Sequence, residues 1–479
     1  MEQSEEGVLA FIREWGLYTD FYQLTMAQGY WRHGLHREPA TFDYYFRKMP
    51  CDTGYVVFAG LADVLDAVAH FTFPAEALER LKEEGFAEGF IDYLRDFRFE
   101  GDIYAPREGE IVFDNEPVVI VKGKVLECQL IETMLLNIIN YQSLIATRAS
   151  RISKVTGAGR LFSDFGFRRG HGMGAIQGSR AAVIGGAAST SNVLAATKYG
   201  LKVMGTMAHS WIQVFEDELL AFRRYAEVYP DHCVLLVDTY NTLHSGVPNA
   251  IKVGKELAEK GHRLKAIRID SGDMAYLARK ARAMLDAAGM DYVKILSSNQ
   301  LDEYLIRSLN LQKAPIDGFG VGTRLITSYQ CPAMGGVYKL SSFGGKPRLK
   351  LSDDIAKISL PGEKWVWRFY DRSDYFYRDG IYLSDEDPAT EHCVCHPTYQ
   401  SMFTNISGYK MERLQQAVMK EGKILDIERD PYAISDYRKK RLMQVPQETQ
   451  RFENPHVYKV GLSRALWDLR DKLIKQHSK

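Results

Sequence analysis

The sequence predicts an α/β fold in which a central region of parallel strands and helices follows an α+β domain and precedes a β-rich extension. Between residues 160 and 325, short apolar strands alternate with helices of ordinary length. The strands recur about every 30 residues, which fits either a (β/α) barrel or a doubly wound sheet. After residue 336 the helical pattern gives way to aromatic, β-rich sequence. A chain of 479 residues exceeds the size of one core, so we expect domains at 1–150, 151–335 and 336–479.

The first domain combines a helix near its start with short strands and a long final helix. A helix is expected after Asp20, because Leu24, Ala27 and Trp31 recur at helical spacing and Gly34 can end it. Tyr22 then lies at the helix entrance. Alternating polar and apolar residues predict strands at 41–47, 54–59, 110–115 and 117–121. An amphipathic pattern predicts a helix over 127–150.

The central domain is predicted as six strands with intervening helices. The strands are expected at 160–163, 202–205, 234–237, 265–269, 293–296 and 318–321. The helices are expected at 179–199, 211–225, 247–259, 274–288 and 302–309. In the extension, segments 365–370 and 374–384 are predicted to form a hairpin with Arg378-Asp379-Gly380 as its turn, and 461–475 a final helix.

Charge and cysteine usage narrow the class of protein. Lys plus Arg and Asp plus Glu both total 61, so no basic excess favours nucleic acid or an anionic membrane. The acidic N-terminus lacks the pattern of a signal peptide, and we expect a cytoplasmic protein. Six scattered cysteines indicate reduced thiols. The cluster of His392, Cys393, Cys395 and His396 lacks the spacing of a zinc knuckle, so packing or surface placement is favoured over zinc.

Polar residues follow every predicted central strand. After the second strand, Thr206, His209 and Ser210 crowd the start of a helix, where unpaired N–H groups favour an anion. His209 is the candidate nucleophile or acid/base, although a packing role is a common alternative for a single histidine. Because the C-terminal ends of parallel strands line one cleft in both architectures, all six junctions are expected to converge.

The residue types at these junctions indicate a phosphorylated sugar ligand. Gly320, Gly322 and Thr323 can cradle a phosphate, since the glycines leave the backbone bare. Planar guanidinium groups that can clamp a carboxylate or a second phosphate are Arg168, Arg169 and Arg268. Carboxylates that can hold Mg²⁺ or ribose hydroxyls are Asp238, Asp270 and Asp273. The alternative is that these acids and bases only neutralise one another in the interior.

Common nucleotide motifs are missing from the sequence. It holds no Gly-x-x-x-x-Gly-Lys-Ser/Thr loop and no Gly-x-Gly-x-x-Gly after a strand. A phosphosugar aldolase or isomerase would need a Lys or Glu at a strand end, and the six junctions supply none. A non-catalytic nucleotide-binding protein remains an alternative.

Taken together, the junctions resemble the nicotinate phosphoribosyltransferase family over almost the whole chain. The resemblance is carried by the segments Thr-Asp-Phe-Tyr-Gln-Leu-Thr-Met (19–26), Phe-Gly-Phe-Arg-Arg (165–169), Gly-Thr-Met-Ala-His-Ser (205–210), Asp-Thr-Tyr (238–240), Arg-Ile-Asp-Ser-Gly-Asp (268–273), Gly-Val-Gly-Thr (320–323), Gly-Val-Tyr-Lys-Leu (336–340) and Pro-Gly-Glu-Lys (361–364). The first and third of these segments look like the nicotinate branch rather than the nicotinamide or quinolinate enzymes.

The resemblance implies a fold and a reaction. The fold is an irregular barrel with an N-terminal α/β domain and a C-terminal extension, assembled as a homodimer with shared active sites. The reaction converts nicotinate and phosphoribosyl pyrophosphate into nicotinate mononucleotide and pyrophosphate, with ATP as co-substrate and Mg²⁺ as cofactor. This reaction is the first step of NAD salvage from nicotinate.

The resemblance also implies residue roles. His209 would be phosphorylated by ATP. Thr206, Ser210 and Arg268 would surround nicotinate and the phosphohistidine. Tyr22 would stack on the pyridine ring from the neighbouring subunit, and Arg168 or Arg169 would attract the carboxylate of nicotinate. The ribose 5-phosphate would be held by Gly320, Gly322 and Thr323. Asp238 and Asp270 would serve the ribose, Mg²⁺ or the cationic transition state, with Asp273 as a second metal ligand.

Overall fold

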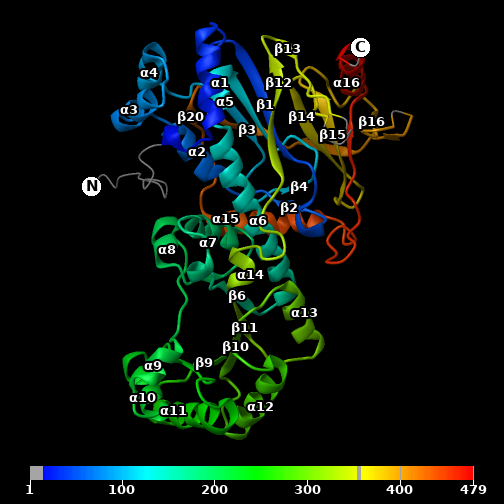
Figure 1. The fold of residues 1–479 in the computed structure, drawn as a ribbon. Helices are drawn as coiled ribbons and strands as arrows, with labels where there is room; N and C mark the ends of the chain where they lie inside the picture. Colours follow the sequence, from blue (N-terminus) through cyan, green and yellow to red (C-terminus); the bar gives the residue numbers. More distant parts are fainter. Residues whose placement is uncertain (1–14, 353–357, 400, 478–479) are drawn as a thin grey trace. The chain divides into compact units, whose positions relative to one another are not determined.

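The computed structural model describes residues 15–352, 358–399 and 401–477 (Figure 1). Its contacts divide the chain into two compact units, one made of 1–147 with 333–479 and the other of 148–332. The two ends of the chain therefore fold together, and the central region forms a unit of its own. No helix in the described part of the chain is long and apolar enough to cross a membrane.

The first unit is built on a seven-stranded antiparallel sheet. From edge to edge the strands are β13 (Lys346–Pro347), β12 (Gly336–Phe343), β1 (Pro39–Phe46), β5 (Val119–Lys124), β3 (Asp102–Ala105), β19 (Gln416–Lys420) and β20 (Lys423–Ile424). The ring of Phe42 on β1 stacks on that of Tyr338 on β12, with centroids 4.8 Å apart. Strands from both ends of the chain thus share one apolar core.

Helices pack on this core. They are α1 (Phe21–Arg32), α2 (Leu61–Ala69), α3 (Ala75–Glu83), α4 (Glu88–Arg95), α5 (Val125–Leu130) and α6 (Glu132–Thr156). The predicted helix after Asp20 is present as α1. The single helix predicted over 127–150 is wrong, because the structure has two helices, α5 and α6, that separate at Ile131. Strands β2 (Val56–Val57) and β4 (Ile111–Val112) form a small separate sheet.

The extension adds a second sheet to this unit. Its order is β17 (Phe403–Asn405), β16 (Cys393–Cys395), β21 (Val460–Leu462), β15 (Phe376–Leu383), β14 (Lys364–Tyr370) and β18 (Lys410–Arg413). Helix α15 (Pro431–Gln444) precedes β21 in the chain, and helix α16 (Arg464–His477) follows it.

The predicted hairpin is present as β14 and β15, but its predicted turn is wrong. Arg378, Asp379 and Gly380 lie inside β15, paired with β14. The turn spans 371–375, where Asp371 accepts backbone N–H groups from Ser373 at 2.8 Å and Tyr375 at 2.9 Å. An Asp side chain that bonds the backbone two residues on forms a turn without glycine, which explains the error.

The second unit is a parallel six-stranded sheet with helices. The strand order is β7 (Ser189–Thr190), β6 (Leu161–Asp164), β11 (Gly318–Val321), β10 (Lys294–Ser298), β9 (Ala266–Ile269) and β8 (Val234–Leu236). The helical elements are η4 (Phe167–Arg169), α7 (Gly174–Ile184), α8 (Val193–Tyr199), α9 (His209–Gln213), α10 (Glu218–Val228), η5 (Thr242–Gly246), α11 (Val247–Glu259), α12 (Met274–Ala287), α13 (Glu303–Leu311) and α14 (Thr323–Ile326).

Two predicted helices of this unit are each broken in two. The helix predicted at 179–199 contains β7, because Gly186, with φ of 111°, lies just beyond α7 and the side chain of Asn192 caps α8. The helix predicted at 211–225 is α9 and α10, and Asp217 caps the second of these. The strand predicted at 202–205 is reduced to an isolated bridge between Thr190 and Val203.

The mixed α/β architecture is confirmed, whereas a closed barrel is not. The first strand, β6, pairs with the last, β11, as a barrel requires. In the described residues, however, β7 and β8 stand at the two edges of the sheet and do not pair.

Candidate functional site

The predicted residues gather at the C-terminal edge of the parallel sheet. Leu236 is in register with Arg268, and Ile269 is in register with Ser297. Ser298 is in register with Gly320 on β11. Extending the register by one or two residues places Asp238, Asp270, Ser298 and Gly320 in one row across four strands. Hydrogen bonds along this row agree with that placement.

Two carboxylates occupy adjacent places in the row. Asp238 is 9% exposed, and its Oδ2 accepts from the backbone N–H of Asp270 at 2.8 Å and from the hydroxyl of Ser271 at 2.6 Å. Its Oδ1 is buried and has no hydrogen-bond partner among the described residues. Ser298 donates to Oδ1 of Asp270. Asp238 is thus held rigidly by one oxygen and keeps the other free for a ligand.

Arg268 reaches across to the loop before α9. Its Nη1 donates to the hydroxyl of Thr206 and to the carbonyl of Met207 at 3.3 Å. Burial lowers the pKa of Arg268 and the charge of Arg168 acts in the same direction, whereas Asp270 and Asp238 oppose them. Its Nε is buried without a partner in the described part of the chain. This guanidinium therefore retains a donor for an anionic ligand.

His209 opens helix α9 and contacts the neighbouring junction. Ala208 precedes it in an extended conformation, so the imidazole lies at the first helical position. Its Nδ1 is 3.1 Å from the hydroxyl of Thr239, which follows β8. With Nδ1 as donor to that oxygen, Nε2 carries the lone pair and can act as a nucleophile or base. Ser210, the next residue, is exposed.

The glycines of the predicted phosphate cradle lie close to Phe165, which leaves little space for a larger side chain at these positions. A Cβ atom on Gly320 would lie 2.5 Å from the ring of Phe165, and one on Gly322 would lie 3.0 Å from the carbonyl oxygen of Phe165. Close packing therefore requires Gly320 whether or not a phosphate binds. Thr323 is half-buried at the first position of α14.

The remaining predicted residues stand apart from this row. Arg168 and Arg169 are exposed on η4, although the charge of Arg168 reaches Arg268. Tyr22 belongs to the first unit, is 49% exposed, and lies with its hydroxyl 3.5 Å from Oε1 of Glu132.

Asp273 serves as a helix cap. Its carboxylate accepts the backbone N–H of Tyr276 at 2.9 Å and begins α12. No group of three or more His, Cys, Asp or Glu side chains suited to a metal occurs in the described residues, including the segment around His396. Mg²⁺ usually binds proteins through only one or two carboxylates plus substrate phosphates. Asp238 and Asp270 can supply these two carboxylates.

Three hydroxyls at the site belong to the junctions that were expected to converge, but no role was predicted for them. Thr239 and Ser271 each follow a predicted aspartate by one residue, and Ser298 ends β10. Their positions at strand ends were the available signal. Their function depends on register across the sheet, which a single sequence does not specify.

Family models of one family match successive segments that together span most of the chain. The family model described as nicotinate phosphoribosyltransferase (NAPRTase) family matches residues 161–364. Models of the N-terminal and C-terminal domains of nicotinate phosphoribosyltransferase match residues 17–140 and 363–470.

Individual relatives span nearly the full length. The nicotinate phosphoribosyltransferase of Bacillus subtilis (strain 168) is 42% identical over 460 residues, covering 94% of this chain and 93% of the relative. That of Caenorhabditis elegans is 34% identical, covering 96% and 94%. The crystal structure of human nicotinic acid phosphoribosyltransferase superposes with a TM-score of 0.86 at 28% identity, covering 95% of this chain and 99% of that one.

Proposed function

The chain belongs to the nicotinate phosphoribosyltransferase family, and from that membership we propose that it makes nicotinate mononucleotide and couples the reaction to ATP through a phosphohistidine at His209. One observation carries the proposal. The row of Asp238, Asp270 and Ser298, flanked by Arg268, puts two carboxylates and a guanidinium at one sheet edge with buried polar atoms still unsatisfied.

The transfer step needs stabilisation of positive charge. The pyridine nitrogen of nicotinate gives its electron pair to C1 of the ribose, and the bond from C1 to pyrophosphate breaks with its pair on the leaving oxygen. C1 is cationic in the transition state, so the carboxylates of Asp238 and Asp270 lower the barrier electrostatically. The predicted phosphate cradle at Gly320, Gly322 and Thr323 anchors the ribose 5-phosphate.

Nicotinate is held by the cationic and aromatic groups. Arg168 or Arg169 attracts its carboxylate. Tyr22 stacks on the pyridine ring from the partner subunit of a homodimer, which is consistent with the exposure of its side chain here.

The ATP step uses Nε2 of His209. The N–H at Nδ1 donates a hydrogen bond to the hydroxyl of Thr239, and Nε2 attacks the terminal phosphorus of ATP while ADP leaves. Arg268, Thr206 and Ser210 contact the transferred phosphate. Water later cleaves the N–P bond and releases phosphate. The doubly charged phosphohistidine shifts the site toward a form that binds substrate more tightly, so ATP drives the cycle without reacting with nicotinate.

Mg²⁺ would be held by Asp270, with Asp238 or Asp273 as a second ligand, and would neutralise the pyrophosphate leaving group. Asp273 keeps one carboxylate oxygen beyond its capping bond, so both roles are compatible.

The irregular barrel and the cytoplasmic location belong to the same proposal. Pairing of β6 with β11 and the bridge from Thr190 to Val203 support a ring that is nearly complete. None of the six cysteines, all of which lie in the described residues, forms a disulfide, and this fits a reducing compartment.

Substrate identity is tested by pyrophosphate release. The purified chain is assayed with phosphoribosyl pyrophosphate and nicotinate, nicotinamide or quinolinate, each with and without ATP. Release that depends on nicotinate and rises with ATP supports the proposal. Turnover of another pyridine in preference to nicotinate, or no turnover at all, contradicts it, and the second result favours a binding protein.

A further inference from the structure

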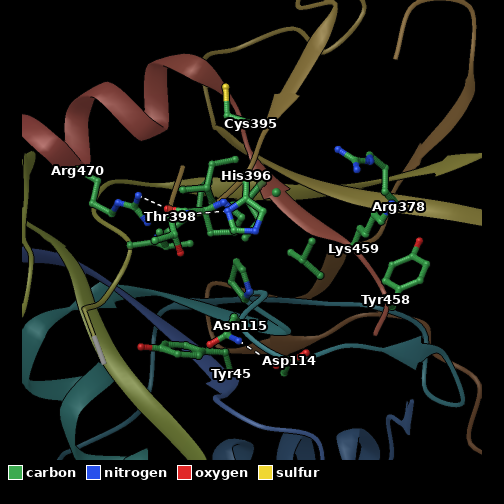
Figure 2. Close-up of a pocket in the computed structure, with 18 of the residues that line it drawn as sticks. Tyr45, Asp114, Asn115, Arg378, Cys395, His396, Thr398, Tyr458, Lys459 and Arg470 are labelled. Carbon is green, nitrogen blue, oxygen red and sulfur yellow. Dashed lines mark hydrogen bonds between the residues drawn. The ribbon is translucent and has the colours of Figure 1, made fainter. Parts of the chain in front are cut away.

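A cavity of about 840 Å³ lies within the first unit, between its two large sheets, whereas the row of carboxylates belongs to the second unit (Figure 2). Its lining comes from β1, β14 and β15 together with the segments 395–398, 402–404 and 456–462. The volume falls in the range of roughly 300–1,000 Å³ typical of small-molecule sites. Apolar side chains such as Leu360, Ile381 and Phe403 form part of the wall.

The most informative residue in this cavity is Arg378 on β15. It is only 8% exposed, and its Nε has no hydrogen-bond partner in the described part of the chain. Burial lowers the pKa of this guanidinium, and the groups that oppose the shift are tyrosines, led by Tyr377 and Tyr458, with no carboxylate among them. A buried cation without a counter-ion is costly unless an anion binds beside it.

A second cation flanks Arg378. Asp379 is in register with Val460 in the parallel pair of β15 and β21, and its backbone N–H donates to the carbonyl of Lys459 at 3.0 Å. Residues in register on parallel strands point to the same face, so Lys459 and Arg378 stand side by side. Figure 2 shows them together on one side of the cavity, with Arg470 on the other.

His396 adds a directed donor between them. Its Nδ1 accepts backbone N–H groups from Thr398 at 3.1 Å and Tyr399 at 3.3 Å. Because Nδ1 is an acceptor, the ring proton of the neutral imidazole lies on Nε2 and can be donated to a ligand.

Among the described residues that line the cavity, the charges do not cancel. Lys364 is paired with Asp43, so that buried pair is neutral. Asp114 is the other lining acid, and burial raises its pKa. The other lining cations are Arg378 and Lys459, together with Lys339, which interacts with Glu132, and Arg470, which interacts with Asp471. This excess of positive charge favours a ligand group with more than one negative charge. The rest of the cavity has a partly apolar wall, which can hold an organic group attached to that anion.

We propose that this cavity binds a phosphate monoester of up to nucleotide size, with Arg378 and Lys459 on the phosphate. The proposal concerns a site separate from the catalytic row and does not depend on the reaction assigned to that row. Its ligand would stabilise the first unit by satisfying the buried guanidinium.

The test uses AMP as the phosphate monoester and adenosine as its uncharged counterpart, on the full chain. Lysines are acetylated with and without each compound, and modified peptides are mapped by mass spectrometry. Lys459 is exposed, so we expect it to be acetylated in the free protein. We expect AMP to protect Lys459 at least severalfold, adenosine to leave it unprotected, and Lys410, with 65% of its side chain exposed elsewhere, to react equally throughout. Because the readout is a single peptide, AMP bound at the catalytic row does not contribute.

A variant supplies an independent readout. Arg378→Met removes the unpaired charge while keeping an apolar side chain of similar length. We expect its thermal unfolding midpoint without ligand to be no lower than that of the wild type, and protection of Lys459 by AMP to be lost. Arg413→Met, an exposed substitution on β18, should keep the protection. Protection by adenosine, no protection by AMP, or retained protection in Arg378→Met would each overturn the proposal.

Discussion

His209 and Thr239 follow different strands of the second unit, and the imidazole Nδ1 lies 3.1 Å from the threonine hydroxyl. The contact joins the junction before α9 to the junction after β8. When Nδ1 donates to the threonine oxygen, Nε2 carries the lone pair, as a nucleophile requires. The first prediction rests on this pair.

Labelled ATP should leave an acid-labile, base-stable phosphate on the wild-type chain and none on His209→Asn. Thr239→Val removes the partner of Nδ1 and should slow phosphorylation about fivefold, since one hydrogen bond is worth about 1 kcal/mol. Thr239→Ser keeps the hydroxyl and serves as the matched control. Undiminished labelling of His209→Asn would show that the phosphate is carried elsewhere.

Asp238→Asn tests the electrostatic role of the row. An asparagine can still accept from the backbone N–H of Asp270 and from Ser271, so the fold should persist, but the negative charge is lost. We expect kcat to fall on the order of 10²–10³-fold with a smaller change in KM for nicotinate. Steady-state kinetics and the thermal unfolding midpoint separate this effect from misfolding. A variant that keeps its midpoint and full kcat would remove Asp238 from the mechanism.

Asp273 has two proposed roles that substitutions can separate. Asp273→Asn keeps the cap on α12, whereas Asp273→Ala removes it and should cost about 1 kcal/mol of stability. If Asp273 is a metal ligand, both variants should need more Mg²⁺ for half-maximal turnover. An unchanged Mg²⁺ dependence in Asp273→Asn would leave capping as its function.

Local patterns predicted the elements with long, regular signals. The helix expected at 247–259 is α11, and the strand at 318–321 is β11. Strand β7 was missed because two residues are too short to show alternation. The turn of the hairpin was misplaced because Arg378-Asp379-Gly380 has turn composition while neighbouring strands hold it extended.

Long-range arrangement lay beyond a single sequence. That β12 and β19 join β1, β5 and β3 in one sheet follows from packing between distant segments. For the site, the polar residues at the predicted strand ends indicated Asp238, Asp270, Arg268 and His209. Their alignment in the structure depends on the register between neighbouring strands, which a single sequence does not specify. The free oxygen of Asp238 and the unpaired Arg378 became apparent only from side-chain burial.

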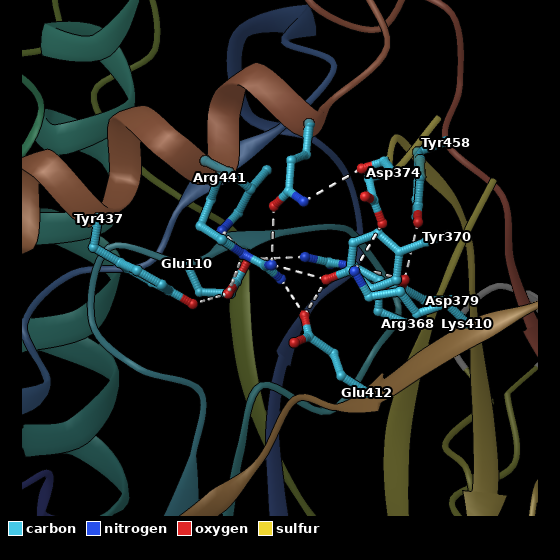
Figure 3. A network of polar contacts seen from close by, with 12 residues as sticks. Glu110, Arg368, Tyr370, Asp374, Asp379, Lys410, Glu412, Tyr437, Arg441 and Tyr458 are labelled. Carbon is cyan, nitrogen blue, oxygen red and sulfur yellow. Dashed lines mark hydrogen bonds and ion pairs between the residues drawn. The ribbon is translucent and has the colours of Figure 1, made fainter. Parts of the chain in front are cut away.

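The last prediction concerns a buried ionic network in the first unit. Figure 3 shows Arg368 beside Asp379, and its Nε and Nη2 donate to the two carboxylate oxygens at 3.0 and 2.7 Å. Tyr458 donates to the same carboxylate at 2.9 Å. Glu116 lies next to this pair and accepts the backbone N–H of Phe113 at 2.9 Å. Burial raises the pKa of Glu116 well above its usual range, and the charge of Asp379 raises it further.

This shift makes stability depend on pH in a definite direction. In the unfolded chain Glu116 loses its proton near its ordinary pKa of 4.5, while the folded protein keeps it to higher pH. The folded state then binds more protons, so the free energy of unfolding falls as pH rises from about 4.5 toward the folded pKa. Glu116→Gln cannot ionise and should lose less stability than the wild type over that interval. The check is the thermal unfolding midpoint across a pH series, with Glu421→Gln, exposed on the surface, as control. Parallel losses in wild type and Glu116→Gln would mean that the folded protein holds no proton on Glu116.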